Sequence, residues 1–175
     1  MDFAILYAIQ TTRTNFLDNF FIFITNIAGD YGQIWVYLAI ALLLFKKTRK
    51  MGITILLSYG LVYVIAQYGL KDLIARPRPC HLDTSIELLV KRPSSYSCPS
   101  THSAWAFAAA TSVFLYNKKF GLVTYLVATI IAFSRLYMFV HFPSDVLFGI
   151  ILGIIFAFIS YKLLNNFIFK GERNE

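Results

Sequence analysis

Six apolar stretches, separated by short polar runs, make up most of the chain. They run from about Asn15 to Ala28, Tyr31 to Phe45, Gly52 to Leu70, Ser100 to Tyr116, Phe120 to Val140 and Pro143 to Leu164. A helix needs about 20 residues to cross the hydrocarbon core of a bilayer, and sometimes as few as about 17. The last four stretches therefore predict full membrane spans, and the first two are short ones. The pattern predicts an all-α, integral membrane six-helix bundle.

A seventh, shorter apolar segment precedes these six. Phe3 to Ile9 is apolar, and the polar run from Gln10 to Asn15 separates it from the next stretch. No basic residue precedes it and no small-residue cleavage site follows it, which argues against a signal peptide. We expect a short amino-terminal interfacial helix here. One long, bent first span is the alternative.

Composition supports the membrane assignment. Of the 175 residues, 58% are apolar and 14% are charged, whereas soluble domains average about 45–50% and about 25%. The length predicts a single domain, residues 1–175. The net charge of +7 could suggest nucleic acid, but that function needs basic residues clustered on a polar face. Here they occur in short bursts between apolar segments, so no nucleic-acid partner is expected.

The basic residues also predict an orientation, because Lys and Arg accumulate in cytoplasmic loops. With both termini on one side, that side carries ten of the sixteen: Arg13, Lys46, Lys47, Arg49, Lys50, Lys118, Lys119, Lys162, Lys170 and Arg173. The other side carries six: Lys71, Arg76, Arg78, Lys91, Arg92 and Arg135. The bias predicts cytoplasmic termini, with the connection between the third and fourth spans facing outward.

Two polar groups flank this outward connection. The first is the run KDLIARPRP, residues 71–79, whose cations could also be interfacial side chains that reach toward water. The second, Pro99 to His102, opens the fourth span. Ser100 is a candidate helix cap, and the free N–H groups of a helix start can bind phosphate. An ordinary capped helix with an incidental histidine is the alternative.

A third polar group, residues 134–145, closes the fifth span and opens the sixth. An arginine in the membrane costs at least about 2.5 kcal/mol, so Arg135 is expected to face a wet, polar pocket. His141 and Asp145 are four residues apart across a helix start. The carboxylate can therefore hold one ring nitrogen while the other faces a substrate. A structural histidine with a satisfied hydrogen bond is the alternative.

In order and spacing, the three groups resemble the type 2 phosphatidic acid phosphatase superfamily, the lipid phosphate phosphatases related to vanadium haloperoxidases. The family pattern is Lys, six residues, Arg-Pro; then Pro-Ser-Gly-His; then Ser-Arg, five residues, His, three residues, Asp. The matching residues here are Lys71, Arg78 and Pro79, then Pro99, Ser100 and His102, then Ser134, Arg135, His141 and Asp145. Thr101 replaces the glycine, which would let the backbone approach an anion closely.

The resemblance implies a role for each group, and side-chain chemistry agrees. Three cations, Lys71, Arg78 and Arg135, neutralise the phosphoryl group. The start of the fourth span, at Ser100 and Thr101, adds neutral donors. His141 attacks phosphorus to form a phosphohistidine, Asp145 orients it, and His102 protonates the leaving oxygen.

Other residues are interpreted more simply. No carboxylate cluster of the kind that holds magnesium accompanies the motifs, so no metal or cofactor is expected, as the resemblance also implies. Arg76 matches no position of the pattern and is interpreted as a rim or interfacial residue. Cys80 and Cys98 are either a disulfide or two free thiols. The small residues Gly149, Gly153 and Ala157 indicate either packing inside the bundle or a dimer face, so the oligomeric state stays open.

The resemblance implies an integral membrane phosphatase acting on a lipid phosphate or diphosphate, with its site at the outer face of the cell membrane. Small bacterial members of the family commonly act on undecaprenyl diphosphate, which is therefore the expected substrate. Phosphatidylglycerophosphate and phosphatidic acid are alternatives. A small anionic-lipid transporter or flippase would explain the cations but not the spacing of His102, His141 and Asp145.

Overall fold

The computed structural model describes residues 1–168, which form helices and their connections. The helices are α1 (Asp2–Gln10), α2 (Asn15–Ala28), α3 (Gln33–Leu43), α4 (Arg49–Leu61), η1 (Val62–Leu70), α5 (Lys71–Ile74), α6 (Pro79–Leu82), α7 (Thr101–Tyr116), α8 (Lys118–Tyr137), α9 (Pro143–Leu163) and η2 (Leu164–Ile168). The all-α prediction is confirmed, and a helix occupies each predicted apolar stretch. The short amino-terminal helix is also present, and it is separate from α2.

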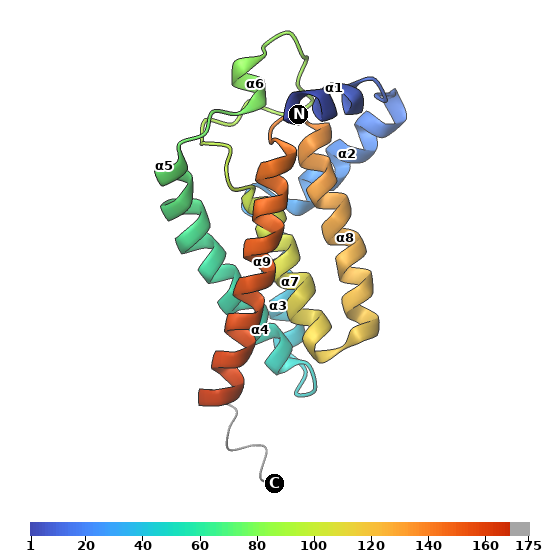
Figure 1. Cartoon of the computed structure of the whole chain (residues 1–175). Coiled ribbons are helices and arrows are strands. Elements are labelled where there is room, and N and C mark those ends of the chain that lie inside the picture. Colours follow the sequence, from blue (N-terminus) through green and yellow to red (C-terminus); the bar gives the residue numbers. More distant parts are fainter. Residues whose placement is uncertain (169–175) are drawn as a thin grey trace.

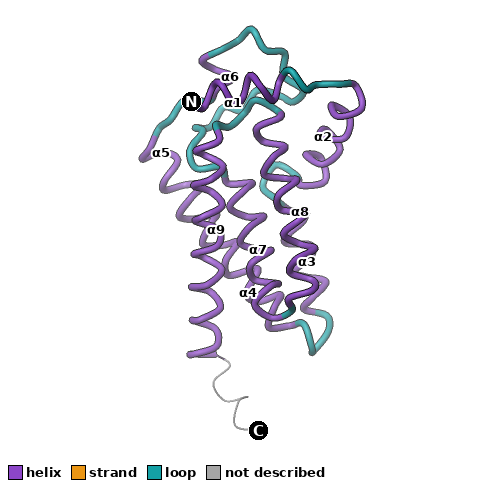
Figure 2. The backbone as a smooth tube through the Cα atoms, turned by 45° about the vertical axis from the view of Figure 1, so that its right-hand side comes forward, coloured by secondary structure: helices purple, strands orange, loops and turns teal. Residues whose placement is uncertain are grey.

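Helix α7 is the centre of the bundle, with α8, α9 and α4 packed around it (Figures 1 and 2). Eleven of its 16 residues are buried, and most of these are Ala, Ser or Thr. Helix α9 approaches it so closely that a Cβ atom added at Gly149 or Gly153 would lie 2.3 Å from a carbonyl oxygen of the α7 segment. The small-residue face of α9 therefore packs inside the bundle, and this face is not free to form a dimer.

Three helical stretches are long and apolar enough to cross a membrane: Arg49–Leu82, Lys118–Tyr137 and Pro143–Asn166. Gln33–Leu43 is apolar but shorter. Of the four stretches predicted to be full-length spans, three reach this length, and the fourth, α7, has only 16 residues. The predicted fourth span, α7, is short and rich in small and hydroxyl residues because it faces other helices on nearly every side.

Helices α2 and α3 follow one another along the bundle instead of running side by side (Figures 1 and 2). Gly29 and Gly32, with φ of 72° and 67°, redirect the chain between them, and such angles are readily adopted by glycine. The Tyr59 hydroxyl anchors this link by donating to the Tyr31 carbonyl oxygen at 2.7 Å. The two short apolar stretches thus make one passage along the bundle where two were predicted.

One consequence concerns the ends of the chain. Helix α1 lies across one end of the bundle, here called the near end (Figure 1). At the opposite, far end, α4 begins, α7 meets α8, and α9 finishes. The prediction that both termini share one side is therefore wrong for the described chain. Because α2 and α3 together cross the bundle once and not twice, α1 and the end of α9 lie at opposite ends. Lys170 and Arg173, counted in that prediction, lie outside the described residues.

Candidate active site

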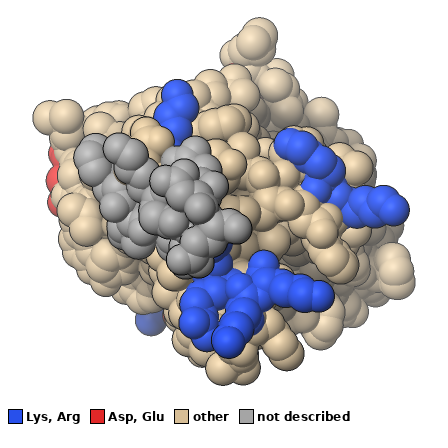
Figure 3. All heavy atoms as spheres, turned by 90° about the horizontal axis from the view of Figure 1, so that it is seen from below, with Lys and Arg blue, Asp and Glu red and all other residues tan. Residues whose placement is uncertain are grey.

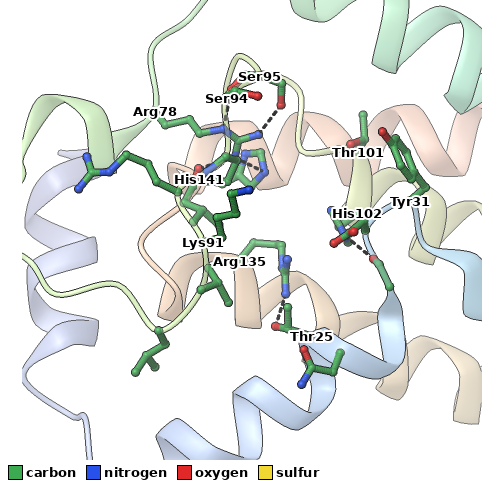
Figure 4. Close-up of a pocket in the computed structure, with 18 of the residues that line it drawn as sticks. Thr25, Tyr31, Arg78, Lys91, Ser94, Ser95, Thr101, His102, Arg135 and His141 are labelled. Atoms are coloured by element: carbon green, nitrogen blue, oxygen red, sulfur yellow. Dashed lines mark hydrogen bonds between the residues drawn. The ribbon is translucent and has the colours of Figure 1, made fainter.

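The three polar groups of the sequence meet at the near end, around a cavity of about 710 Å³. Lys71, Arg78, His102, Arg135 and His141 all line it. Figure 4 shows the two histidines on opposite sides of the cavity, with the Arg135 guanidinium between them in this view. Residues up to 70 positions apart in the sequence thus face one space of a size typical of ligand sites.

His141 lies in the connection between α8 and α9, where Arg78 fixes its tautomer. The two side chains are joined by a 3.1 Å contact between Arg78 Nη1 and His141 Nε2. A guanidinium has no acceptor, so Nε2 carries the lone pair and Nδ1 carries the proton. Burial and the Arg78 cation lower the pKa of His141. The ring is therefore neutral, with its nucleophilic nitrogen next to a phosphate-binding group.

Asp145 lies behind His141 at the start of α9 and is fully buried. Its Oδ2 is 3.8 Å from His141 Nδ1, and that ring nitrogen has no hydrogen-bond partner. The same oxygen accepts from the Phe142 N–H at 2.8 Å and from the Ser97 hydroxyl. These donors hold the carboxylate in line with Nδ1, where a positive charge on the ring would draw it into a hydrogen bond.

The cations Lys71, Arg78 and Arg135 are 4–5% exposed. Arg78 donates to the carbonyl oxygens of Ser95 at 2.7 Å and Val140 at 2.8 Å. Within residues 1–168, no carboxylate forms an ion pair with any of the three. Buried charges are normally paired, so this cluster provides three uncompensated positive charges for an anion.

The Arg135 guanidinium is held at the α8 wall of the cavity. Its Nη2 donates to Ser134 Oγ at 2.9 Å and also to the Thr25 hydroxyl of α2. Both partners are neutral, so they orient the side chain and leave its charge in place. The prediction that Arg135 faces a polar pocket is confirmed.

His102, in the first turn of α7, is oriented by the link between α2 and α3. Its Nε2 lies 2.9 Å from the Gly29 carbonyl oxygen, which can only accept, so Nε2 carries a proton. Trp105 packs against the ring edge, with 5.9 Å between centroids. Nδ1 is then the nitrogen available for proton exchange. Residues 22–31 thus line the cavity and contact Arg135 and His102, which no motif predicted.

Ser100 and Thr101 differ from their predicted roles. Ser100 is at the N-cap position of α7, but its side chain caps no backbone N–H and instead contacts Ser103 Oγ at 2.9 Å. It does not line the cavity, whereas Thr101 does. The Thr101 hydroxyl donates to Gln67 Oε1 at 3.1 Å. The extra side chain at the glycine position of the pattern is therefore accommodated by a partner on η1.

The two cysteines are both buried and free. Cys80 packs with the apolar residues that follow α8. Cys98 precedes α7, where burial and the nearby Asp145 carboxylate raise the pKa of its thiol to about 11. In this structure the two thiols are separate, and each is packed in its own environment.

Arg76 is more than a rim residue. Its Nη1 donates to Asp145 Oδ1 at 2.6 Å, and its Nη2 lies 2.9 Å from Asp2 Oδ2.

Within residues 1–168, no cluster of three or more His, Cys, Asp or Glu side chains could hold a metal ion. The contacts of Arg76 and Ser97 were missed from the sequence, although the hydroxyl-rich run SSYSCPS at residues 94–100 was a usable signal.

Comparison with known proteins identifies the family. Residues 47–169, well over half of the chain, match the PAP2 superfamily. This chain belongs to the PAP2 superfamily. It is thus a membrane lipid phosphate phosphatase with helical spans. Five of its motif residues line the cavity: Lys71, Arg78, His102, Arg135 and His141.

Several PAP2 relatives resemble this chain along most of its length. The undecaprenyl-diphosphatase of Sulfolobus acidocaldarius is 30% identical over 148 residues, which is 84% of this chain and 70% of the relative. The undecaprenyl-diphosphatase BcrC of Bacillus subtilis is 26% identical over 171 residues, 93% of this chain and 83% of the relative. The crystal structure of Aquifex aeolicus LpxE superposes with a TM-score of 0.75 at 32% identity, covering 92% of this chain and 94% of that one.

Proposed function

We propose that this PAP2 phosphatase hydrolyses undecaprenyl diphosphate to undecaprenyl phosphate at the outer face of the cell membrane, through a phosphohistidine. The observation that carries the proposal is the cavity that holds Lys71, Arg78 and Arg135 without carboxylate partners beside a neutral His141. A phosphoryl group supplies the negative charge that these three side chains lack.

The first step forms the covalent intermediate. A bound phosphate takes over the Arg78 donor that now contacts His141 Nε2, which frees the lone pair. Nε2 attacks phosphorus, and the bond from phosphorus to the bridging oxygen breaks. His102, protonated at Nδ1 once the negative phosphate is bound beside it, gives this proton to the leaving lipid phosphate. The ring becomes positive, and Asp145 accepts a hydrogen bond from its Nδ1 proton.

The second step regenerates the enzyme. His102, now neutral at Nδ1, accepts a proton from water, whose oxygen attacks phosphorus. The phosphorus–nitrogen bond breaks, inorganic phosphate leaves, and His141 is again a neutral ring. The Gly29 carbonyl keeps His102 Nε2 protonated throughout, so that Nδ1 performs both transfers.

The orientation follows from the charges at the far end of the bundle. Seven basic residues occupy it (Figure 3): Lys46, Lys47, Arg49, Lys50, Lys118, Lys119 and Lys162. None of the seven Asp and Glu residues within residues 1–168 belongs to these far-end segments. The near end also has seven basic residues, but Lys71, Arg78 and Arg135 are buried at the cavity and not in a loop. Because Lys and Arg in loops mark the cytoplasmic side, we infer that the far end is cytoplasmic. The near end, with the cavity and α1, is then outside.

The substrate preference is supported by the two relatives named as undecaprenyl-diphosphatases and by the cavity itself. Lys91 and Ser94 line it together with Arg78 (Figure 4), and Lys91 is exposed. A diphosphate places a second phosphoryl group outside the cationic cluster, within reach of such a lysine. Phosphatidylglycerophosphate or phosphatidic acid would leave it unused.

Phosphate release tests the proposal. Purified protein in detergent is given undecaprenyl diphosphate, phosphatidylglycerophosphate and phosphatidic acid, and we expect the first to be the best substrate. His141→Ala should lower kcat by about 10⁴-fold or more. His81→Ala, which replaces an exposed histidine outside the cavity, is the control and should retain full activity.

Two results would contradict parts of this proposal. Equal kcat/KM for all three lipids would refute the substrate preference but not the reaction. Undiminished release by His141→Ala would refute the catalytic assignment.

A further inference from the structure

The Arg76 side chain joins the first residues of the chain to the Asp145 carboxylate. Nη1 is 2.6 Å from Asp145 Oδ1 and 2.7 Å from Ser144 Oγ, while Nη2 is 2.9 Å from Asp2 Oδ2. Ser144 closes the cycle by donating to the same Asp2 oxygen. The guanidinium also lies over the Phe142 ring, 4.1 Å from its centroid. Both terminal nitrogens of the guanidinium and one of its faces are thus in contact.

Arg76 and two other donors divide the two oxygens of Asp145 between them. Arg76 takes Oδ1, and the Phe142 N–H and the Ser97 hydroxyl take Oδ2. Oδ2 is the atom that faces His141 Nδ1. A buried carboxylate that loses the donor on one oxygen can rotate toward new partners, because an unsatisfied buried charge costs more than the rotation. Arg76 is also the cation that forms the ion pair with this fully buried group.

We propose that Arg76 is a positioning residue for the His141–Asp145 pair, and that Asp2 holds Arg76 in this geometry. Helix α1 is therefore a working part of the site. The inference rests on the catalytic role proposed above for His141 and Asp145. Arg76 does not line the cavity, so it acts through Asp145 and not on the substrate.

Helix α1 is anchored so that Asp2 reaches Arg76. Leu6 is fully buried, and the Phe3 ring meets the Phe142 ring edge-on at 5.1 Å. Gln10 Nε2 donates to the Tyr137 carbonyl oxygen at 3.0 Å. Burial alone would raise the pKa of Asp2, but the Ser144 and Arg76 donors lower it. Asp2 therefore stays charged at neutral pH and keeps its contact with the guanidinium.

Steady-state kinetics on undecaprenyl diphosphate test the inference. Arg76→Gln should lower kcat by about 100-fold, the effect expected of a displacement near 1 Å in a catalytic group, with KM changed less than about threefold. Arg76→Lys keeps a charge but loses the fork, so it should recover part of kcat. Asp2→Asn removes a partly exposed ion pair, so its kcat should fall by about two- to fivefold, and a wild-type kcat would refute the role of Asp2.

The double variant Asp2→Asn/Arg76→Gln tests whether the two residues act together or independently. If Asp2 acts through Arg76, Asp2→Asn should have no further effect on kcat in the Arg76→Gln background. Tyr7→Phe is the matched control for α1, because it removes the 2.8 Å bond from Tyr7 to Asp83 in the outer loop and touches no site residue. Its kcat should equal that of the wild type.

Several results would overturn the inference. One is a wild-type kcat in Arg76→Gln. Another is a raised KM with unchanged kcat in that variant, which would make Arg76 a substrate contact. A third is that the losses in kcat add up in the double variant. If Arg76→Gln does not fold, as judged by size-exclusion chromatography, then kcat of Arg76→Lys and of Asp2→Asn is compared with that of the control Tyr7→Phe. Asp145→Asn is measured in parallel. A wild-type kcat in Asp145→Asn would refute the proposed mechanism itself. A low kcat in Asp145→Asn together with a wild-type kcat in Arg76→Gln would refute only the inference.

Discussion

Gly149 lies where α9 crosses the start of α7, and replacing it with alanine should damage both stability and catalysis. An added Cβ would lie 2.3 Å from the Ser100 carbonyl oxygen and 3.3 Å from the Ser103 Cβ. Ordinary contact begins near 3.4 Å, so the two helices must separate by about 1 Å. The obstacle is backbone, so a side-chain rotation cannot relieve it.

The separation occurs where two motifs are joined. The Ser100 N–H donates to the Asp145 carbonyl oxygen at 3.1 Å, so moving α7 away from α9 carries His102 away from His141. Overpacking of this kind costs about 1–3 kcal/mol of stability. A shift of about 1 Å in a catalytic group costs about 100-fold in rate. We expect Gly149→Ala to melt earlier and to lose about 100-fold in kcat.

Two further glycines are controls for this prediction. Gly153→Ala meets the Ala104 carbonyl oxygen at the same 2.3 Å, but one turn farther from the site, so it should lose similar stability and less activity. Gly60 has no atom within 4 Å of an added Cβ, so Gly60→Ala should be near neutral. Thermal unfolding in detergent and phosphate release measure both effects. Wild-type melting and kcat in Gly149→Ala would refute the close packing, and equal kcat losses at 149 and 153 would refute its link to the site.

Three other variants or treatments probe single contacts. Thr101→Gly removes the hydroxyl that donates to Gln67 and should cost about 1 kcal/mol of stability, since glycine is unfavourable in a helix; a kcat change above threefold would contradict a purely structural role. Lys91→Ala should raise KM about tenfold for a lipid diphosphate, the value of one charge-assisted contact, but not for a monophosphate; equal shifts would refute the second-phosphate contact. Because Cys80 and Cys98 are buried and free, an alkylating reagent should modify them only after denaturation, with or without reductant, as mass spectrometry would show.

The positions of the helices and of the main site residues could be predicted from the sequence. Long apolar runs bounded by polar residues gave α8 and α9 within a few residues, because in a membrane the run length reflects the bilayer thickness. Lys71, Arg78, His102, Arg135 and His141 were predicted to share one site from order and spacing, and all five line the cavity. Motif residues are predictable in this way because their chemistry restricts both residue type and spacing.

The path of the chain through α2 and α3 could not be predicted in the same way. With 14 and 11 residues, both helices are shorter than a span, and hydropathy does not reveal whether the chain turns back between them. That depends on the backbone angles of Gly29 and Gly32 and on contacts of the link with His102 and Tyr59. These contacts join residues 28 to 73 positions apart. The predicted side of the amino terminus was wrong for this reason.

Arg76 was missed for a related reason. It is 69 residues from Asp145 and 74 from Asp2, and it matches no position of the family pattern used here. A cation near the end of a span is most simply read as an interfacial anchor. Only the packing of α1 across the near end shows that its two partners are carboxylates from opposite ends of the sequence.

The short central helix explains why a length rule is least reliable at the site itself. Helix α7 has 16 residues against 20 in α8 and 21 in α9, and Thr101 and His102, its first two residues, line the cavity. Its free N–H groups, where the helix dipole is positive, therefore end below the cations instead of at the membrane surface. An additional apolar turn would make α7 a full span and would fill the space that the phosphate needs. Two features therefore accompany the short length of α7: its packing inside the bundle and the cavity at its start.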